Sequence, residues 1–214
     1  MVRQKRIGWI LFVVIILGVG GFAIAPYLLF DPALSRIKLN SAVPYQFPLL
    51  LVHIFISFIA LGIGWIQFIP SLRQKQARIH RFVGRIYLGC IAIGGATGIV
   101  VGLFEESYIR QLAFWTLAVL WLFTGWKGYR SALRRNFEAH RSWMIRNYAM
   151  TMVAVSARIV TPICILLYFA AHGNSAGGDI AMVLGKVLEV NIWLGLVINV
   201  VISEWTLQSY FRKQ

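Results

Sequence analysis

The chain has 214 residues, of which 59% are hydrophobic and 13% are charged. Soluble domains contain about 45–50% apolar and about 25% charged residues, so this composition excludes an ordinary soluble domain and indicates that lipid forms part of the solvent. The formal net charge is +14. The Lys and Arg residues lie between apolar runs and form no single basic stripe or arm, so we expect no nucleic acid among the partners.

Six apolar runs follow one another along the chain, at residues 7–30, 47–70, 86–104, 111–126, 148–171 and 181–207. A helix needs about 20 apolar residues to cross the hydrocarbon, and each run is near that length, although the fourth is short. Backbone groups in lipid must bond within their own structure, and the alternating pattern of a membrane barrel is absent. We therefore predict an all-α, polytopic membrane helix bundle of about six transmembrane helices, with residues 1–214 as a single transmembrane domain.

The basic residues predict the orientation of this bundle. Three precede the first run, five follow the second, six lie between the fourth and fifth, and two end the chain. The opposite connectors hold three basic and four acidic residues. The positive-inside rule therefore places both the N- and the C-terminus in the cytoplasm, and we expect a multi-pass protein of the bacterial inner (plasma) membrane. The connectors 73–85 and 134–146 lack proline and glycine clusters, so we expect them to extend the third and fifth helices below the membrane.

Two stretches of the sequence share a theme, since residues 80–87 read HRFVGRIY and residues 140–148 read HRSWMIRNY. The first enters the third apolar run, and the second enters the fifth. These stretches resemble the bacterial membrane-protein family catalogued as domain of unknown function 2306, as do the further positions His53, Arg158, Trp193, Asn199, Glu204 and Trp205. The resemblance runs from about His53 to Trp205. It implies a polytopic membrane fold and a set of positions to examine, and it implies no activity.

The histidines are the main candidates for cofactor chemistry. His80 and His140 both lie about one to two turns below the cytoplasmic ends of apolar runs, so we expect them to share a depth and face each other. Histidines on neighbouring helices are the axial ligands of b-type haem in helical bundles. His80, His140 and His53 are therefore candidate ligands of haem b. The alternative is a structural or lipid-contacting role, because an isolated membrane histidine identifies no cofactor.

The surroundings of these histidines suggest further contacts. Arginines bind lipid phosphate, so we expect anionic lipid headgroups at the cytoplasmic-edge residues Arg81, Arg85, Arg141 and Arg146. His53 lies within the second apolar run, where a polar ring normally faces the bundle interior. Its candidate partners are Asn191 and Glu189 in the sixth run.

Arg158 lies near the middle of the fifth apolar run. An unpaired cation there costs at least about 2.5–3.5 kcal/mol, so we expect it to have a partner. Glu189 and Glu204 are the acidic candidates, and Lys186 competes for Glu189 because the two are three residues apart on one helix. One interpretation is a proton or anion relay through Arg158, Glu189 and Lys186. The other is a buried ion pair that fixes the fifth helix against the sixth.

Three functions are compatible with these residues. The first is a haem-binding redox protein that exchanges electrons with quinone or a partner protein. The second is a non-enzymatic membrane subunit or assembly factor of a larger complex, whose basic edge meets anionic lipid or an acidic partner. The third is a small transporter, in which the polar residues of the fifth and sixth runs line a path. Whether the protein is an enzyme does not follow from the sequence.

Overall fold

The computed structural model describes residues 2–172 and 180–212, and all regular structure in these ranges is helical. In chain order the elements are α1 (Val2–Ile24), η1 (Ala25–Leu29), η2 (Pro32–Leu34), α2 (Gln46–Gly64), η3 (Trp65–Phe68), α3 (Pro70–Lys75), α4 (Ala77–Gly102), α5 (Tyr108–Leu133), α6 (Phe137–His172) and α7 (Ile180–Phe211). The predicted all-α architecture is therefore confirmed.

Five stretches within the described residues are long and apolar enough to cross a membrane: Ile7–Leu29, Gln46–Phe68, Ala77–Gly102, Phe137–His172 and Ile180–Ser209. The helix α5 is as long as α4, at 26 residues, but it carries several Trp, Thr and Gly residues that lower its hydropathy. It nevertheless packs against α4, α6 and α7. The expected number of about six membrane-crossing helices agrees with this arrangement.

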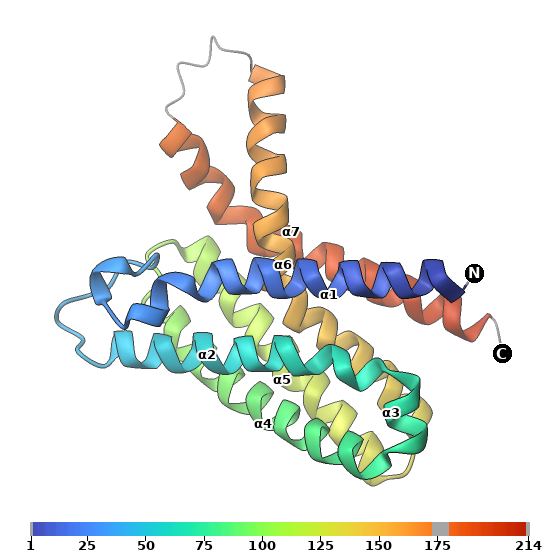
Figure 1. Cartoon of the computed structure of the whole chain (residues 1–214). Coiled ribbons are helices and arrows are strands. Elements are labelled where there is room, and N and C mark those ends of the chain that lie inside the picture. Colours follow the sequence, from blue (N-terminus) through green and yellow to red (C-terminus); the bar gives the residue numbers. More distant parts are fainter. Residues whose placement is uncertain (1, 173–179, 213–214) are drawn as a thin grey trace.

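The helix α1 begins, and the helix α7 ends, on the same side of the bundle as α3 (Figure 1). We call this side, with the α5–α6 connection, the basic end, and we call the opposite side, with residues 31–45 and 103–107, the loop end. Two termini on one side agree with an even number of crossings. The helices α4 and α6 begin at Ala77 and Phe137, well before the apolar runs that they contain. The predicted helical extensions are therefore confirmed from Ala77 and from Phe137 onward, whereas residues 73–75 belong to the separate helix α3 and residues 134–136 form a turn.

Close packing between α4 and its neighbours depends on small residues. A Cβ atom added at Gly95 would lie 2.5 Å from Cγ of Leu122 in α5, and one added at Gly94 would lie 3.0 Å from the ring of Trp121. Helices approach closely in lipid through such positions, because van der Waals contact replaces the hydrophobic effect as the driving force. Gly94 also approaches Oγ of Ser57 in α2, so α4 packs closely against both α2 and α5.

The connected halves of α6 and α7 form a hairpin that projects from the rest of the bundle. The C-terminal half of α6 and the N-terminal half of α7 rise away from α1 and α2 (Figure 1). Large apolar side chains are exposed there, with Leu166 and Leu167 at 70% and 63%, and the exposed Lys186 is an exception. An apolar surface of this kind is suited to lipid, so this hairpin adds to the membrane-embedded surface.

Candidate functional site at the basic end of the bundle

A buried polar network joins α4, α5 and α6. The hydroxyl of Tyr87 donates to Oδ1 of Asn147 at 2.8 Å and lies 2.9 Å from Oγ1 of Thr151. Nε1 of Trp121 also donates to Oγ1 of Thr151, at 2.9 Å. Nδ2 of Asn147 donates to the carbonyl of Trp121 and to Oγ1 of Thr124. Tyr87 and Asn147 are almost completely buried, so these bonds fix the three helices against one another away from water.

This network sets the relative depth of two histidines. His80 precedes Tyr87 by seven residues, and His140 precedes Asn147 by seven. Seven residues are about two turns, so each histidine lies on the same face of its helix as the bonded residue above it. The helices α4 and α6 both start at the basic end, and His80 lies within electrostatic reach of His140 and of Arg73. The structure thus places His80 and His140 at the same end of the bundle, within electrostatic reach of each other.

The two rings differ in their hydrogen bonding. Nδ1 of His140 lies 2.8 Å from the carbonyl of Gly128 in α5, and because a carbonyl only accepts, Nδ1 carries the hydrogen. The neutral ring then has an unprotonated Nε2, which is the form that binds a metal. Nδ1 of His80 is buried and has no hydrogen-bond partner among the described residues. Nε2 of Gln67 is also buried without a hydrogen-bond partner among the described residues. The side chain of Gln67 packs against Gly84, which lies one turn after His80.

His53 belongs to a different part of the bundle. Its Nδ1 lies 2.9 Å from the carbonyl of Gly94, and its Cε1 lies 3.0 Å from where a Cβ atom of Gly98 would be. Gly94 follows His80 by fourteen residues, which is about 21 Å along a straight helix. His53 therefore does not share a site with His80 and His140. It forms a hydrogen bond with α4, whereas the sequence suggested partners in the sixth apolar run, which is α7.

The residues proposed as its partners are placed elsewhere. Nδ2 of Asn191 donates to Oγ1 of Thr161 in α6 at 3.1 Å. No bond from His53 to Asn191 or Glu189 exists in the ranges 2–172 and 180–212. The prediction of these partners is wrong because α2 faces α4 at the depth of His53, and α7 lies against α6.

The ion pair between α6 and α7 involves a different arginine from the one expected. Glu204 accepts two bonds from Arg146, with Nε to Oε1 at 2.5 Å and Nη2 to Oε2 at 2.9 Å. Arg158 instead donates from Nη1 to the carbonyl of Ala154 in its own helix, at 2.8 Å. Arg158 lies about three turns beyond Arg146 along α6, too far from Glu204 to reach it. The predicted pairing of Arg158 with Glu204 is therefore wrong.

The other two members of the proposed relay are also separate from Arg158. Nζ of Lys186 lies 5.9 Å from the ring centroid of Tyr168. Among the described residues, Glu189 forms no ion pair with Arg158 or with Lys186. The structure does not bring Arg158, Lys186 and Glu189 together as a charge relay.

Cations and aromatic rings alternate along the basic end. Arg81 and Arg85 are exposed on α4, and Arg141 is partly buried on α6. The guanidinium of Arg146 lies 5.0 Å from the ring of Trp143, and Nζ of Lys127 lies 5.4 Å from the same ring. Amphipathic aromatics and arginines are typical of the level of the lipid headgroups.

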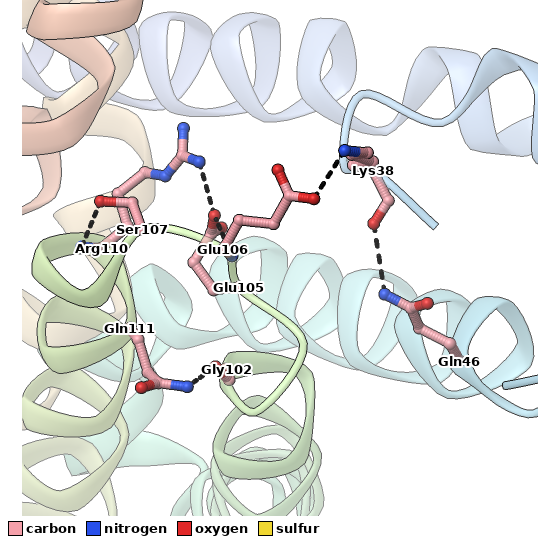
Figure 2. A network of polar contacts seen from close by, with 8 residues as sticks. All are labelled: Lys38, Gln46, Gly102, Glu105, Glu106, Ser107, Arg110 and Gln111. Carbon is pink, nitrogen blue, oxygen red and sulfur yellow. Dashed lines mark hydrogen bonds and ion pairs between the residues drawn. The ribbon is translucent and has the colours of Figure 1, made fainter. Parts of the chain in front are cut away.

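The loop end holds a polar cluster that the sequence indicated only as a topology signal. Figure 2 shows an ion pair of 2.6 Å between Lys38 and Glu106 and another of 2.6 Å between Arg110 and Glu105. The hydroxyl of Ser107 caps the start of α5. A serine directly before an apolar run is a signal for this cap. Both acidic residues were recognisable in the sequence; Arg110 lies only five residues after Glu105, whereas Lys38 comes from a distant segment.

One comparison with known proteins gives a match. A family model described as "Predicted membrane protein (DUF2306)" matches residues 50–207. No curated protein matches the chain, and no solved structure matches it. The matched region contains His53, His80 and His140.

Proposed function

Since the chain belongs to the DUF2306 family of predicted membrane proteins, whose description names no activity, we propose a function from the site itself. His80 and His140 hold a b-type haem at the basic end, and the protein transfers electrons in the membrane. The observation that supports this proposal is the common register of the two histidines, each two turns before the Tyr87–Asn147 hydrogen bond. His53, which bonds Gly94 far from this site, takes no part.

Three residues at the site support this proposal. Haem, when bound, would supply a reversible one-electron change at its iron, and the imidazoles of His80 and His140 would hold it. The bond from His140 to the carbonyl of Gly128 orients the ring and leaves Nε2 as the ligand atom, a common second-shell arrangement. Arg73, within electrostatic reach of His80, offers a cation for a propionate carboxylate.

The test is the absorption spectrum of the purified protein after expression with added haem precursor. We expect a Soret band and reduced α and β bands, with haem content lowered severalfold by His80→Ala and by His140→Ala. His53→Ala and His172→Ala are matched controls that keep the haem, because His172 bonds the carbonyl of Tyr168 at the end of α6. Folded protein that stays colourless, or a spectrum lost only in His53→Ala, would contradict the proposal.

The location and partners of this redox protein follow from its charges. Its electron-exchange partner is a quinone or a neighbouring redox protein in the bacterial inner membrane. Its basic end faces the cytoplasm, as the positive-inside rule requires. Arg81, Arg85, Arg141 and Arg146 contact anionic lipid headgroups there. The support for this placement is the concentration of cations and aromatic rings at one end of the bundle.

A second candidate is a non-enzymatic membrane subunit or assembly factor. The observation that favours it is the use of polar side chains for bonds between helices. Nδ2 of Asn199 donates to Oγ of Ser156 at 2.8 Å, and Asn191 bonds Thr161, so both asparagines join α7 to α6. These bonds also weaken the case for a transporter path through Asn191 and Asn199, because their amides are already occupied.

This candidate predicts insensitivity to the histidines. The His80→Ala, His140→Ala double variant is expected to migrate with the same native complex as the unchanged chain on a native gel of solubilised membranes. A complex lost in the double variant but kept in His53→Ala would contradict the subunit role and favour the haem site.

A further inference from the structure

The lipid-facing side of α4 and α5 contains an apolar groove near the basic end. The groove has a volume of about 450 Å³ and is lined by residues that include Leu88, Gly89 and Ala92 of α4 and Leu122, Trp126 and Tyr129 of α5. No acidic residue lines it. Gly89 leaves its floor open, since a Cβ atom added there would meet no atom within 4 Å. We call it the α4–α5 groove.

Cations surround the mouth of the α4–α5 groove. Trp126 and Tyr129 are 50% and 48% exposed at this mouth. The guanidinium of Arg130 lies 5.3 Å from the ring of Trp126, one of the lining residues. Arg85 is exposed and precedes Leu88 and Gly89 by one turn, so it lies on the same face of α4. The apolar groove thus ends between an arginine of α4 and an arginine of α5.

We propose that the α4–α5 groove holds one anionic phospholipid, with an acyl chain along Gly89 and Ala92 and its phosphate between Arg85 and Arg130. The volume of about 450 Å³ is within the range of a site for one small ligand or lipid chain. An acyl chain is narrow enough to enter. The two arginines complement a negative headgroup, and Trp126 and Tyr129 lie where aromatic rings meet the headgroup level. This site is independent of the proposed haem.

The experiment measures lipid binding by native mass spectrometry of the detergent-solubilised full chain, with phosphatidylglycerol and phosphatidylcholine of identical acyl chains as probes. We expect phosphatidylglycerol to bind about 25-fold more tightly, because each of the two arginines near an anionic headgroup contributes a factor of about five. Arg85→Gln and Arg130→Gln should each lower this preference about fivefold.

A second pair of variants tests the acyl-chain half of the site. Gly89→Leu fills the groove and is expected to abolish the retention of both lipids. Gly62→Leu is the matched control, since a Cβ atom at Gly62 in α2 also meets nothing within 4 Å but lies outside the groove. Equal binding of the two lipids, equal retention by the two leucine variants, or a dimer that Gly89→Leu dissociates would each overturn the proposal.

Discussion

Replacing Asn147 by leucine is expected to lower the free energy of unfolding by about 2 kcal/mol. The substitution removes three hydrogen bonds that join α6 to α4 and α5, with Tyr87, the carbonyl of Trp121 and Thr124 as partners. Polar bonds between membrane helices contribute about 0.6 kcal/mol each on average, and buried polar groups left without partners add to the loss. Unfolding of the purified protein by sodium dodecyl sulfate in mixed micelles measures the effect.

Ser142→Ala is the matched control for this substitution. Oγ of Ser142 bonds the carbonyl of Glu138 in its own helix, in an exposed position. We expect no more than about 0.5 kcal/mol of change for this variant. If both variants unfold at the same detergent concentration, the Tyr87–Asn147 network does not fix the helices. Asn147→Leu should also reduce haem content, because the same network sets the register of His80 and His140.

Gly64→Ala is expected to destabilise the protein by about 1–3 kcal/mol through overpacking. A Cβ atom at Gly64 would lie 2.5 and 2.6 Å from the ring of Tyr148 and 2.8 Å from the ring of Tyr87. Both rings are buried, and the hydroxyl of Tyr148 is bonded to the carbonyl of Leu61 at 3.1 Å. Neither ring has room to retreat, so α2 must move away from α4 and α6. Gly64→Leu should prevent folding.

The control for Gly64 lies two residues away in the same helix. Gly62→Ala adds the same methyl group where no atom lies within 4 Å. Alanine also has a higher helix propensity than glycine, so this variant should be neutral or slightly more stable. The thermal midpoint of the detergent-solubilised protein, followed by tryptophan fluorescence, compares the two. A Gly64→Ala midpoint equal to that of Gly62→Ala would show that the packing of α2 on the two tyrosines is loose.

The positions of the helices could be predicted from the sequence, since each depends on a local property of the chain. Hydrophobic runs of spanning length predicted the membrane-crossing stretches of α1, α2, α4, α6 and α7. Most of the predicted boundaries lie within a few residues of the observed ones. The helical connectors at the basic end were predicted from the lack of breakers. Hydropathy was least informative for α5, because Arg110, Gln111, Lys127 and Arg130 lie within this helix and its indole and hydroxyl side chains also score poorly.

The candidate site could be predicted only in part from the sequence. The equal depth of His80 and His140 follows from their distance to the apolar runs, which is a one-dimensional property. The bond of His53 to Gly94 and the pair of Arg146 with Glu204 were not foreseen. Each depends on which helices are neighbours and how they rotate about their axes. An amphipathic pattern would reveal that rotation, but in lipid both the inner and the outer faces are apolar.

By itself, the sequence determined that the chain crosses the membrane as helices, with its cationic connectors on one side. These results follow from the free-energy cost of placing unpaired backbone groups and charges in hydrocarbon. This cost depends on each segment alone. Only the tertiary structure decided that Tyr87 meets Asn147, that Glu204 takes Arg146 and that His53 lies apart from the other two histidines. Those choices are made by side-chain shape and by hydrogen bonds between helices, which depend on residues far apart in the chain.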